Sequence, residues 1–460
     1  AASAEQNMAT AYKVFAGISP GLEHFLTAEL RRIAPVKWRT MTGGAEARVH
    51  AEDLWRVCRS SRLAELVRVR IGEVHATSFH EFVDGVERLP WAAYLKRPAP
   101  RPRVTSSTFR SKLWHTDAIS ERVLVGLANR GVVRYMDLPS DAKKWVRGGR
   151  SLQQKHKGFT FEPSATPASV FVRFDRDSAL ISVDASGPDL YKRGYRAAIG
   201  KSPLRETLAA ACLHVIQDDL DLPEDQPLLQ ARNLWDPMCG SGTLILEAAA
   251  EAVGLEPGHG RNFAFETWPT HDAEAYKSFV ELPMLEQGHA DPKAGDALQV
   301  SAQVPEIPRL KKVAIGSDIS AQAIRSAAAN ARVLGIKGPC MFKRGSMMAM
   351  SPNVPRGAVL ATNIPYGVRL GDDKQAIAGL NEILLKRQDL VGYAICKKGA
   401  LEGNNVGAKR WAPIAEFENG GIPVAICKLT PHKGIRYVEG WSGAKLGRSA
   451  ERLPAPEAQE

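Results

Sequence analysis

The sequence predicts a chain of several domains, with a mixed α+β front half followed by a doubly wound parallel α/β sheet. Its 460 residues are more than one ordinary core holds. From about residue 204 onward, short apolar runs typical of strands alternate with Ala-rich helical segments. That order predicts a parallel sheet with helices on both faces. Before that point strand and helix patterns mix at short range, which predicts an α+β arrangement.

The composition is that of a folded globular protein, with 44% hydrophobic and 24% charged residues. No apolar run approaches the ~20 residues needed to span a bilayer, which argues against a membrane protein. The formal net charge of +11 suits an anionic partner such as nucleic acid. A generally basic protein without such a partner would have the same charge, so charge alone leaves both interpretations open.

The cysteines indicate neither a zinc site nor a disulfide framework, because they are far apart and no CxxC occurs. They are Cys58, Cys212, Cys239, Cys340, Cys396 and Cys427. We therefore expect no metal and reduced thiols in a reducing compartment. The chain begins AASAEQ without an initiator Met, so a cytoplasmic and an organellar location (chloroplast or mitochondrion) both remain open.

The front of the chain shows five short elements. Residues 11–16 read as a strand, and apolar residues recur at helical spacing from Leu22 to Ile33. We expect a second strand over residues 47–50, a helix over 53–60 and a strand over 63–71.

The next hundred residues continue this mixed pattern. We expect a helix over residues 79–94, a strand after the Pro-rich basic connector 96–103, and a helix over 118–129. Residues 141–159 are basic and contain glycines, which predicts a mobile loop. The loop could bind RNA or be a solvated charged segment without a partner. Residues 169–186 form the clearest hairpin pattern, with two β-rich runs around a charged turn.

Residues 234–249, LWDPMCGSGTLILEAA, read as a strand, a Gly-rich turn and a helix starting at Thr243. Gly240 and Gly242 allow positive φ and let the backbone approach a ligand. Asp236 at the strand end can accept hydrogen bonds from an ammonium or a hydroxyl group. The pattern is not G-x-G-x-x-G, and no Walker lysine follows. A plain turn between strand and helix would also explain the two glycines.

A second acid follows the same logic. Asp318 ends the next strand, and a helix starts at Ala321 with Ser320 as the expected N-cap. An acid at this strand end commonly binds ribose hydroxyls, although a helix N-terminus also favours acids through its dipole. The first motif makes us favour ligand binding. The third strand end, MFKRGSMM, offers Ser346 where an adenine contact would lie.

Asn363-Ile364-Pro365-Tyr366 ends a fourth strand. An aromatic amine is a poor nucleophile, because its lone pair is delocalised into the ring. The Asn363 side-chain oxygen and the Ile364 carbonyl could accept its two hydrogens and direct the lone pair at an electrophile. Pro365 would keep Ile364 extended, and Tyr366 would stack on the base. An ordinary turn with a core tyrosine remains the alternative.

Together these motifs resemble class I S-adenosylmethionine-dependent methyltransferases that modify exocyclic amines. DPMCGSGTLILEAA resembles the family's first motif, SDIS its second, and NIPYG its NPPY motif. GLEHFLTAEL and ISVDASGPDLYKRGYRAAIGKSPLRETLAAA are similar to bacterial 23S rRNA guanine-N2 methyltransferases. The resemblance covers roughly residues 11–430 and is densest over 181–250.

The resemblance implies a Rossmann-like class I methyltransferase domain preceded by a ferredoxin-like α+β module and a THUMP domain. The implied divisions are residues 1–72 for the ferredoxin-like module, 73–190 for the RNA-binding THUMP domain, 191–435 for the methyltransferase domain and 436–460 for a tail. Residues 258–303 resemble the insertion that these enzymes carry after the first motif. The larger bacterial relatives continue into a second methyltransferase domain, so we expect this chain to lack that second activity.

The resemblance also implies the site residues. Those expected to bind S-adenosylmethionine are Asp236, Pro237, Met238, Gly240, Gly242, Asp318, Ile319 and Ser346. Those expected to be catalytic are Asn363, Ile364, Pro365 and Tyr366. Asn363 and Ile364 would orient guanine N2, and Tyr366 would stack on the ring.

Charge and position suggest the residues that touch RNA. They are Arg110, Lys112, Lys143, Lys144, Arg147, Arg193, Tyr195 and Arg196. The last three lie at the expected hinge into the catalytic domain, and a buried hinge position for Tyr195 is an equally open interpretation.

Two residues in the motifs depart from the family. Ile364 stands where the first proline of NPPY is usual, and Ser346 stands where an acid is common. The predicted function is guanine-N2 methylation of RNA, with large-subunit ribosomal RNA or its precursor particles as partner. Transfer RNA is an alternative substrate, and a catalytically weak RNA-binding assembly factor is an alternative function. DNA adenine-N6 methylation shares the NPPY logic, but no DNA-recognition motif is visible.

Overall fold

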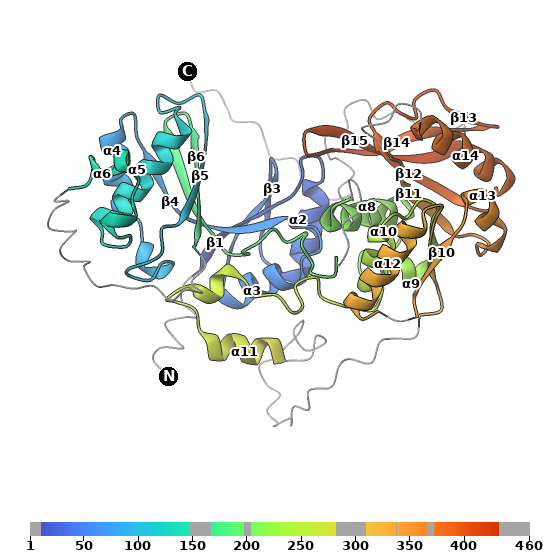
Figure 1. Cartoon of the computed structure of the whole chain (residues 1–460), viewed down its shortest axis with the longest axis horizontal. Coiled ribbons are helices and arrows are strands. Elements are labelled where there is room, and N and C mark those ends of the chain that lie inside the picture. The colour runs from blue at the N-terminus through green and yellow to red at the C-terminus, as the bar shows by residue number, and fades with distance from the viewer. Residues whose placement is uncertain are drawn as a thin grey trace, which may run out of the picture.

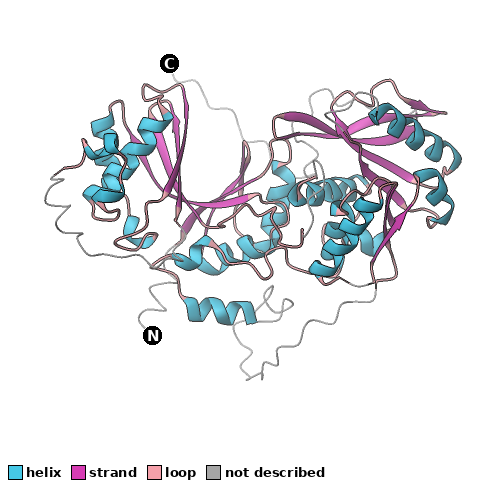
Figure 2. Ribbon diagram, in the orientation of Figure 1, coloured by secondary structure: helices cyan, strands magenta, loops and turns pink. Residues whose placement is uncertain are grey.

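The computed structural model describes residues 11–147, 167–196, 204–281, 310–336, 338–365 and 372–431. Within these ranges the chain forms two β-sheets, one of seven and one of eight strands, each flanked by helices (Figures 1 and 2). The predicted tail at residues 436–460 lies outside the described residues.

The seven-stranded sheet has the order β2-β3-β1-β4-β7-β6-β5. Neighbours pair antiparallel except β5 and β6, which are parallel. The predicted division after residue 72 falls inside β4, which pairs with β1 on one side and β7 on the other, so both front segments share one sheet. The strands are β1 (Tyr12–Gly17), β2 (Arg39–Met41), β3 (Gly44–Val49), β4 (Leu66–His75), β5 (Arg103–Phe109), β6 (Ser169–Asp175) and β7 (Ser178–Asp184).

Helices flank both parts of this sheet. In Figure 1, α4, α5 and α6 lie beside β4, β5 and β6, while α2 and α3 lie near β1 and β3. The elements are α2 (Glu23–Ile33), α3 (Ala51–Ser60), α4 (Phe79–Glu87), η1 (Trp91–Ala93), α5 (Thr116–Asn129), η2 (Tyr135–Asp137) and α6 (Ser140–Lys143).

Two predictions for this part need correction. The helix predicted over residues 79–94 ends at Glu87, and a separate 3-10 turn follows. Pro90 explains the break, because it has no N–H to donate and keeps the residue before it extended. The predicted loop from residue 141 begins with the short helix α6, and its part beyond residue 147 lies outside the described residues.

The eight-stranded sheet has the order β10-β9-β8-β11-β12-β15-β14-β13. The first five strands are parallel, and β15 joins β12 antiparallel. The strands are β8 (Leu234–Asp236), β9 (Ala314–Asp318), β10 (Cys340–Arg344), β11 (Val359–Asn363), β12 (Val391–Lys397), β13 (Asn405–Val406), β14 (Lys409–Asn419) and β15 (Ile422–Pro431).

Apart from η3 and α11, which belong to the insertion, the helices of this half lie on both faces of the sheet (Figure 1). No helix in the described ranges combines the length and apolar character needed to cross a membrane. The elements are α8 (Glu206–Asp219), α9 (Leu228–Ala231), α10 (Thr243–Ala252), η3 (Ala264–Thr267), α11 (Ala273–Glu281), α12 (Ala321–Leu334), α13 (Met347–Met350), η4 (Ser351–Asn353) and α14 (Asp372–Lys386).

Burial along the central strands confirms the predicted doubly wound sheet. Val359 and Ala361 of β11 belong to the core shared with α8 and α10, while Leu360 between them belongs to the core shared with α14. Successive residues of a strand point to opposite faces. A strand that is apolar at every position is therefore buried on both faces.

The described part of the predicted insertion packs against the front of the chain. Trp55 of α3, only 5% exposed, lies against three rings from the insertion, with centroid distances of 6.5 Å to Phe265, 5.2 Å to Tyr276 and 5.7 Å to Phe279. Aromatic pairs at such separations stabilise beyond the area they bury. This aromatic cluster joins the described part of the insertion to α3 of the front half.

We predict that Trp55→Ala lowers the free energy of unfolding by about 3–5 kcal/mol, the usual result of deleting a buried aromatic side chain. Denaturant unfolding followed by circular dichroism measures it. Trp114→Ala is the matched control, because Trp114 is 64% exposed, and it should change stability by no more than about 0.5 kcal/mol. Equal effects of the two substitutions would contradict the packing described for Trp55.

Candidate active site

The strand order of the eight-stranded sheet reverses between β8 and β11. In open parallel sheets, ligands bind at the carboxyl ends of the strands beside such a reversal. Asp236 ends β8, Asp318 ends the neighbouring β9 and Asn363 ends β11. The fold therefore brings the three predicted strand-end residues to one edge of the sheet.

Asp236 is a buried carboxylate held by two hydrogen bonds. The Thr362 hydroxyl donates to its Oδ1 at 2.6 Å, and the Met238 N–H donates to the same oxygen at 3.0 Å. The pKa of Asp236 is raised to about 7, mainly by burial and in smaller part by the nearby charge of Asp318, while the two hydrogen bonds oppose the rise. A carboxyl group that titrates near neutrality in a strand-end crevice is typical of a functional site.

The two glycines of the turn after β8 differ in the space around the position that a Cβ would occupy. Gly242 has φ +83°, and a Cβ there would lie 2.9 Å from Phe342 Cε1 and 3.0 Å from Ala327 Cβ. Gly240 has φ +53°, and a Cβ there would meet no described atom within 4 Å. Gly242 therefore fits the turn against α12 and β10, whereas Gly240 borders open space where a ligand can approach the backbone.

Asp318 connects the first and second strand ends. Its Oδ2 accepts a hydrogen bond from the Gly240 N–H at 3.1 Å, and its Oδ1 accepts one from the Ser320 N–H at 2.8 Å. A carboxylate has about four acceptor sites, so capacity remains for a diol. Ser320 is the N-cap of α12, as predicted. Ile319 is 73% exposed at the same edge, an apolar surface that a flat ring could cover.

Ser346 follows the third strand. The Gly345 N–H donates to the Asp318 carbonyl at 3.0 Å, which holds this strand end beside the second. The Ser346 hydroxyl caps α13 by accepting from the Ala349 N–H at 3.2 Å. Its hydrogen stays available as a donor. Pro237, predicted with this group, is buried in the turn after β8.

The side-chain oxygen of Asn363 is a buried hydrogen-bond acceptor at the end of β11. This Oδ1 accepts no hydrogen bond from any residue that the structure describes. Leaving a buried acceptor unpaired costs about 1–3 kcal/mol, and such a group in a native site needs an explanation. A ligand that donates to this oxygen supplies one.

Ile364, which directly follows Asn363, binds the neighbouring strand through its backbone. The Ile364 N–H donates to the Ile395 carbonyl of β12 at 2.8 Å, and the side chain is 1% exposed. A proline could make no such bond, so isoleucine holds this strand end to the sheet by one more hydrogen bond. Pro365 is exposed. Tyr366 lies outside the described residues.

Two residues that shape the site were not among those predicted. Thr362 binds Asp236, and Phe342 backs both Gly242 and Gly316. A hydroxyl residue inside an otherwise apolar strand, next to Asn363, is a signal that could have identified Thr362. Phe342 is one of many apolar strand residues, so the sequence gives no such signal for it.

Comparison with known proteins agrees with this geometry. Residues 193–387 match the family described as the RMKL-like methyltransferase domain. The ribosomal RNA large subunit methyltransferase K/L of Syntrophotalea carbinolica is 31% identical over 366 residues, which are 78% of this chain and 45% of that protein. The protein of the same name from Methylococcus capsulatus is 30% identical over 79% of this chain and 43% of its own length.

The chain thus spans less than half the length of these two curated relatives. Among solved structures, SMU.472, described as a methyltransferase and solved with SAH, superposes with a TM-score of 0.68 and 23% identity. That match covers 93% of this chain and all of SMU.472. The likeness supports the class I methyltransferase-like fold of the domain.

The predicted RNA-contact residues outside the methyltransferase domain lie mostly on the surface. Arg110, Lys112, Lys144 and Arg147 are exposed, and Lys143 is half-buried. Lys144 pairs with Asp141 at 2.8 Å. The side chain of Lys143 lies 5.7 Å from the Tyr135 ring centroid.

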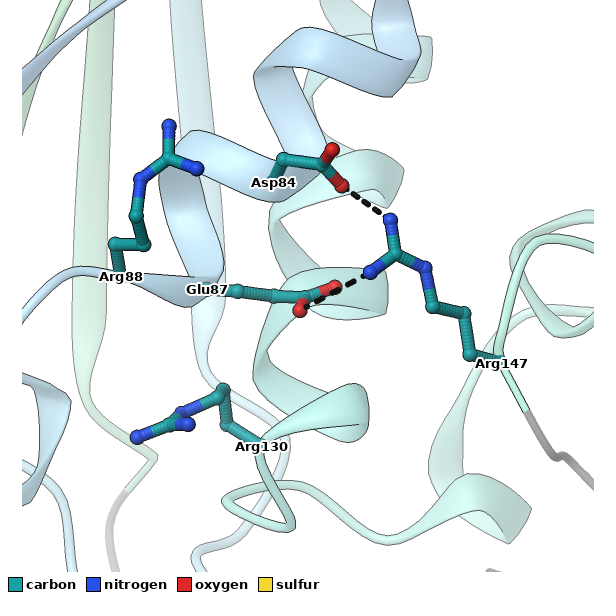
Figure 3. Close-up of a pocket in the computed structure, with 5 residues that line it drawn as sticks. All are labelled: Asp84, Glu87, Arg88, Arg130 and Arg147. Atoms are coloured by element: carbon teal, nitrogen blue, oxygen red, sulfur yellow. Dashed lines mark hydrogen bonds and ion pairs between the residues drawn. The ribbon is translucent and has the colours of Figure 1, made fainter.

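Arg147 belongs to a surface cavity of about 400 Å³ shared with two further arginines (Figure 3). It forms ion pairs with Asp84 and Glu87. Arg88 and Arg130 line the same cavity, and neither forms an ion pair with any described residue. Their guanidinium groups, rather than that of Arg147, are the ones free to meet an external anion.

The three predicted RNA-contact residues at the hinge are largely buried inside the protein instead of exposed on its surface. Arg193 has a side chain only 3% exposed, hydrogen-bonded to the Leu190 and Arg62 carbonyls. The buried Tyr195 donates to Glu247 Oε1 at 2.9 Å, and Arg196 pairs with Glu206 at 2.9 Å. Because their polar groups bind inside the protein, the structure argues against direct RNA contact and favours the buried hinge interpretation.

The described residues contain no cluster of three or more His, Cys, Asp or Glu side chains that could hold a metal ion. The six cysteines are free, and five of them are buried.

We predict that Asp236→Asn makes the protein more stable than wild type by a margin that grows with pH. The folded-state pKa of Asp236 is raised from 3.8 to about 7, so the folded state holds a proton that the unfolded state loses. Wild type should therefore lose about 1.4 kcal/mol per pH unit relative to the variant as pH rises toward 7, and the difference should level off above it. Denaturant unfolding of both proteins between about pH 5 and about pH 8 measures this. A difference independent of pH would contradict the assignment.

Proposed function

We propose that the chain transfers a methyl group from S-adenosylmethionine to the exocyclic N2 of guanine in RNA, and that its substrate is large-subunit ribosomal RNA. The observation that carries the proposal is the buried Asn363 Oδ1 at the strand reversal, which accepts no hydrogen bond from the residues that the structure describes. The names of the curated relatives support the ribosomal substrate.

The residues at the first three strand ends fit the cofactor. S-adenosylmethionine supplies a methyl group on a cationic sulfur. The Asp236 carboxylate and the turn through Met238 and Gly240 would bind the methionine part, whose ammonium group favours the ionised acid. Asp318 would bind the ribose diol, and Ile319 and Ser346 would border the adenine. The open space at Gly240 and the remaining acceptor capacity of Asp318 agree with this fit.

The Asn363 side chain would orient the target amine. Its Oδ1 and the Ile364 carbonyl would accept the two N2 hydrogens and thereby direct the nitrogen lone pair toward the methyl group. The hydrogen bond from Ile364 to β12 keeps this segment fixed before substrate arrives. Pro365 would keep Ile364 extended, and Tyr366 would stack on the guanine. No strong base is required.

The front of the chain would bind the RNA. We propose that residues 1–72 contain a ferredoxin-like module and residues 73–190 a THUMP domain, and that the two share the seven-stranded sheet. Arg110, Lys112, Lys143 and Lys144 are the proposed contacts, and the guanidinium groups of Arg88 and Arg130 take the place of the ion-paired Arg147. A guanine paired in a helix cannot reach the site, so the base would be unpaired or flipped.

We predict that Asn363→Ala lowers the rate of methyl transfer by about 100-fold or more, because it removes one acceptor that orients the amine. Titration calorimetry with SAH should show unchanged binding of the variant, since Asn363 would touch the amine and not the cofactor. Asn405→Ala is the matched control, since Asn405 is exposed on β13 at the far edge of the sheet. Wild-type transfer by Asn363→Ala would remove the basis of the proposal.

We predict that the chain labels unmodified large-subunit RNA with methyl from radioactive S-adenosylmethionine and that the product nucleoside is N2-methylguanosine. Nuclease digestion and mass spectrometry identify the nucleoside, and fragment mapping identifies the RNA. Label in transfer RNA alone would contradict the ribosomal substrate. RNA binding without transfer would favour an assembly factor.

A further inference from the structure

The loop between β5 and α5 displays two large aromatic side chains to solvent. Trp114 is 64% exposed and Phe109 is 51% exposed. Both lie close to the proposed RNA contacts Arg110 and Lys112 in the chain. Burying such rings normally stabilises a protein by a few kcal/mol, so two exposed rings on one loop indicate a surface that something covers.

The loop is held in place by the hairpin beside it. The Lys112 N–H donates to Asp177 Oδ1 at 2.7 Å, the Asp177 N–H donates to the Ser111 hydroxyl at 3.0 Å, and the Arg176 N–H donates to the Phe109 carbonyl at 3.2 Å. Trp114 lies back near the end of β5, since the Thr108 hydroxyl donates to its carbonyl at 3.5 Å. The two rings are therefore presented on an anchored loop and lose little conformational entropy on binding.

Exposed basic residues lie on the same loop and on the hairpin beside it. The Arg110 guanidinium lies 4.9 Å from the Phe109 ring centroid, and Lys112 is exposed on the same loop. Arg176 at the hairpin tip has a side chain 76% exposed. Two acids accompany them. Asp177 accepts from the Lys112 amide, and Asp175 lies 3.8 Å from Arg176.

We propose that Phe109, Arg110, Lys112, Trp114 and Arg176 form a stacking platform for an unpaired RNA segment. Aromatic faces next to exposed basic side chains are how proteins bind single strands, because bases stack on the rings while cations meet the phosphates. Trp114 and Phe109 would each take a base, and Arg110, Lys112 and Arg176 would contact the backbone. A duplex would bind less well, because its bases are already stacked on each other. The platform rests on the proposed function and specifies which part of the RNA the front of the chain holds.

The test titrates the full chain against a fluorescent single-stranded RNA of about 12 nucleotides, measured by anisotropy, and against the same RNA annealed to its complement. Trp114→Ala and Phe109→Ala should each weaken single-strand binding about 5- to 100-fold, and Trp114→Tyr should restore most of the loss for that position. Met136→Ala is the matched control, since Met136 is a 47% exposed apolar residue of the same layer outside the platform, and it should bind as wild type does. SAH binding should not change in any variant.

The proposal is overturned if both alanine variants bind the single strand as tightly as wild type, if the duplex shows the same loss, or if Met136→Ala has an equal effect. Its failure can be told from failure of the proposed function. A wild-type chain that binds RNA through the platform but transfers no methyl group refutes the function alone, and one that methylates RNA with both rings removed refutes the platform alone.

Discussion

The reversal of strand order between β8 and β11 is the constraint on which the site depends. Parallel strands on either side of that point send their following segments to opposite faces, which leaves a crevice at their carboxyl ends. Asp236, Asp318 and Asn363 are 127 residues apart in sequence at their extremes but end three strands of this one sheet. Hydrogen bonds from Thr362 to Asp236 and from Gly240 to Asp318 then fix the strand ends to one another.

The polar side chains at these strand ends differ in whether the protein itself supplies their hydrogen-bond partners. Asp236 and Asp318 accept hydrogen bonds from the chain, whereas Asn363 Oδ1 accepts none from the described residues. A buried acceptor without a donor is unfavourable in the free protein. In the proposed function it would gain a partner when the target amine enters, which would direct binding to one group of the base.

Much of the fold followed from the sequence because its signals are local. The doubly wound order came from the alternation of apolar strand runs with Ala-rich helical segments, and the N-cap at Ser320 from one side chain. The helix predicted over residues 79–94 was too long because amphipathic spacing continued past Pro90, which stops the helix at Glu87. The sharing of one sheet by both front segments depends on β4 pairing on both edges, which sequence periodicity does not reveal.

Some site residues could likewise be predicted from a local sequence pattern, and others could not. Asp236, Asp318 and Asn363 could be chosen because each follows a strand pattern directly. Arg193 and Tyr195 were predicted from charge and position, but their partners Arg62 and Glu247 are distant in sequence, so only the folded chain shows that they are buried. Phe109 at the end of β5 and Trp114 in the following loop were missed, because the sequence pattern does not reveal which aromatic side chains are exposed to solvent.

The most direct test of the account is a crystal structure of this chain with SAH bound. We expect the ribose hydroxyls on the Asp318 carboxylate, the amino acid part beside Asp236 and Gly240, and the sulfur facing the open side of Asn363 Oδ1. SAH bound away from these strand ends, or an Asn363 oxygen turned to a partner inside the protein, would contradict it.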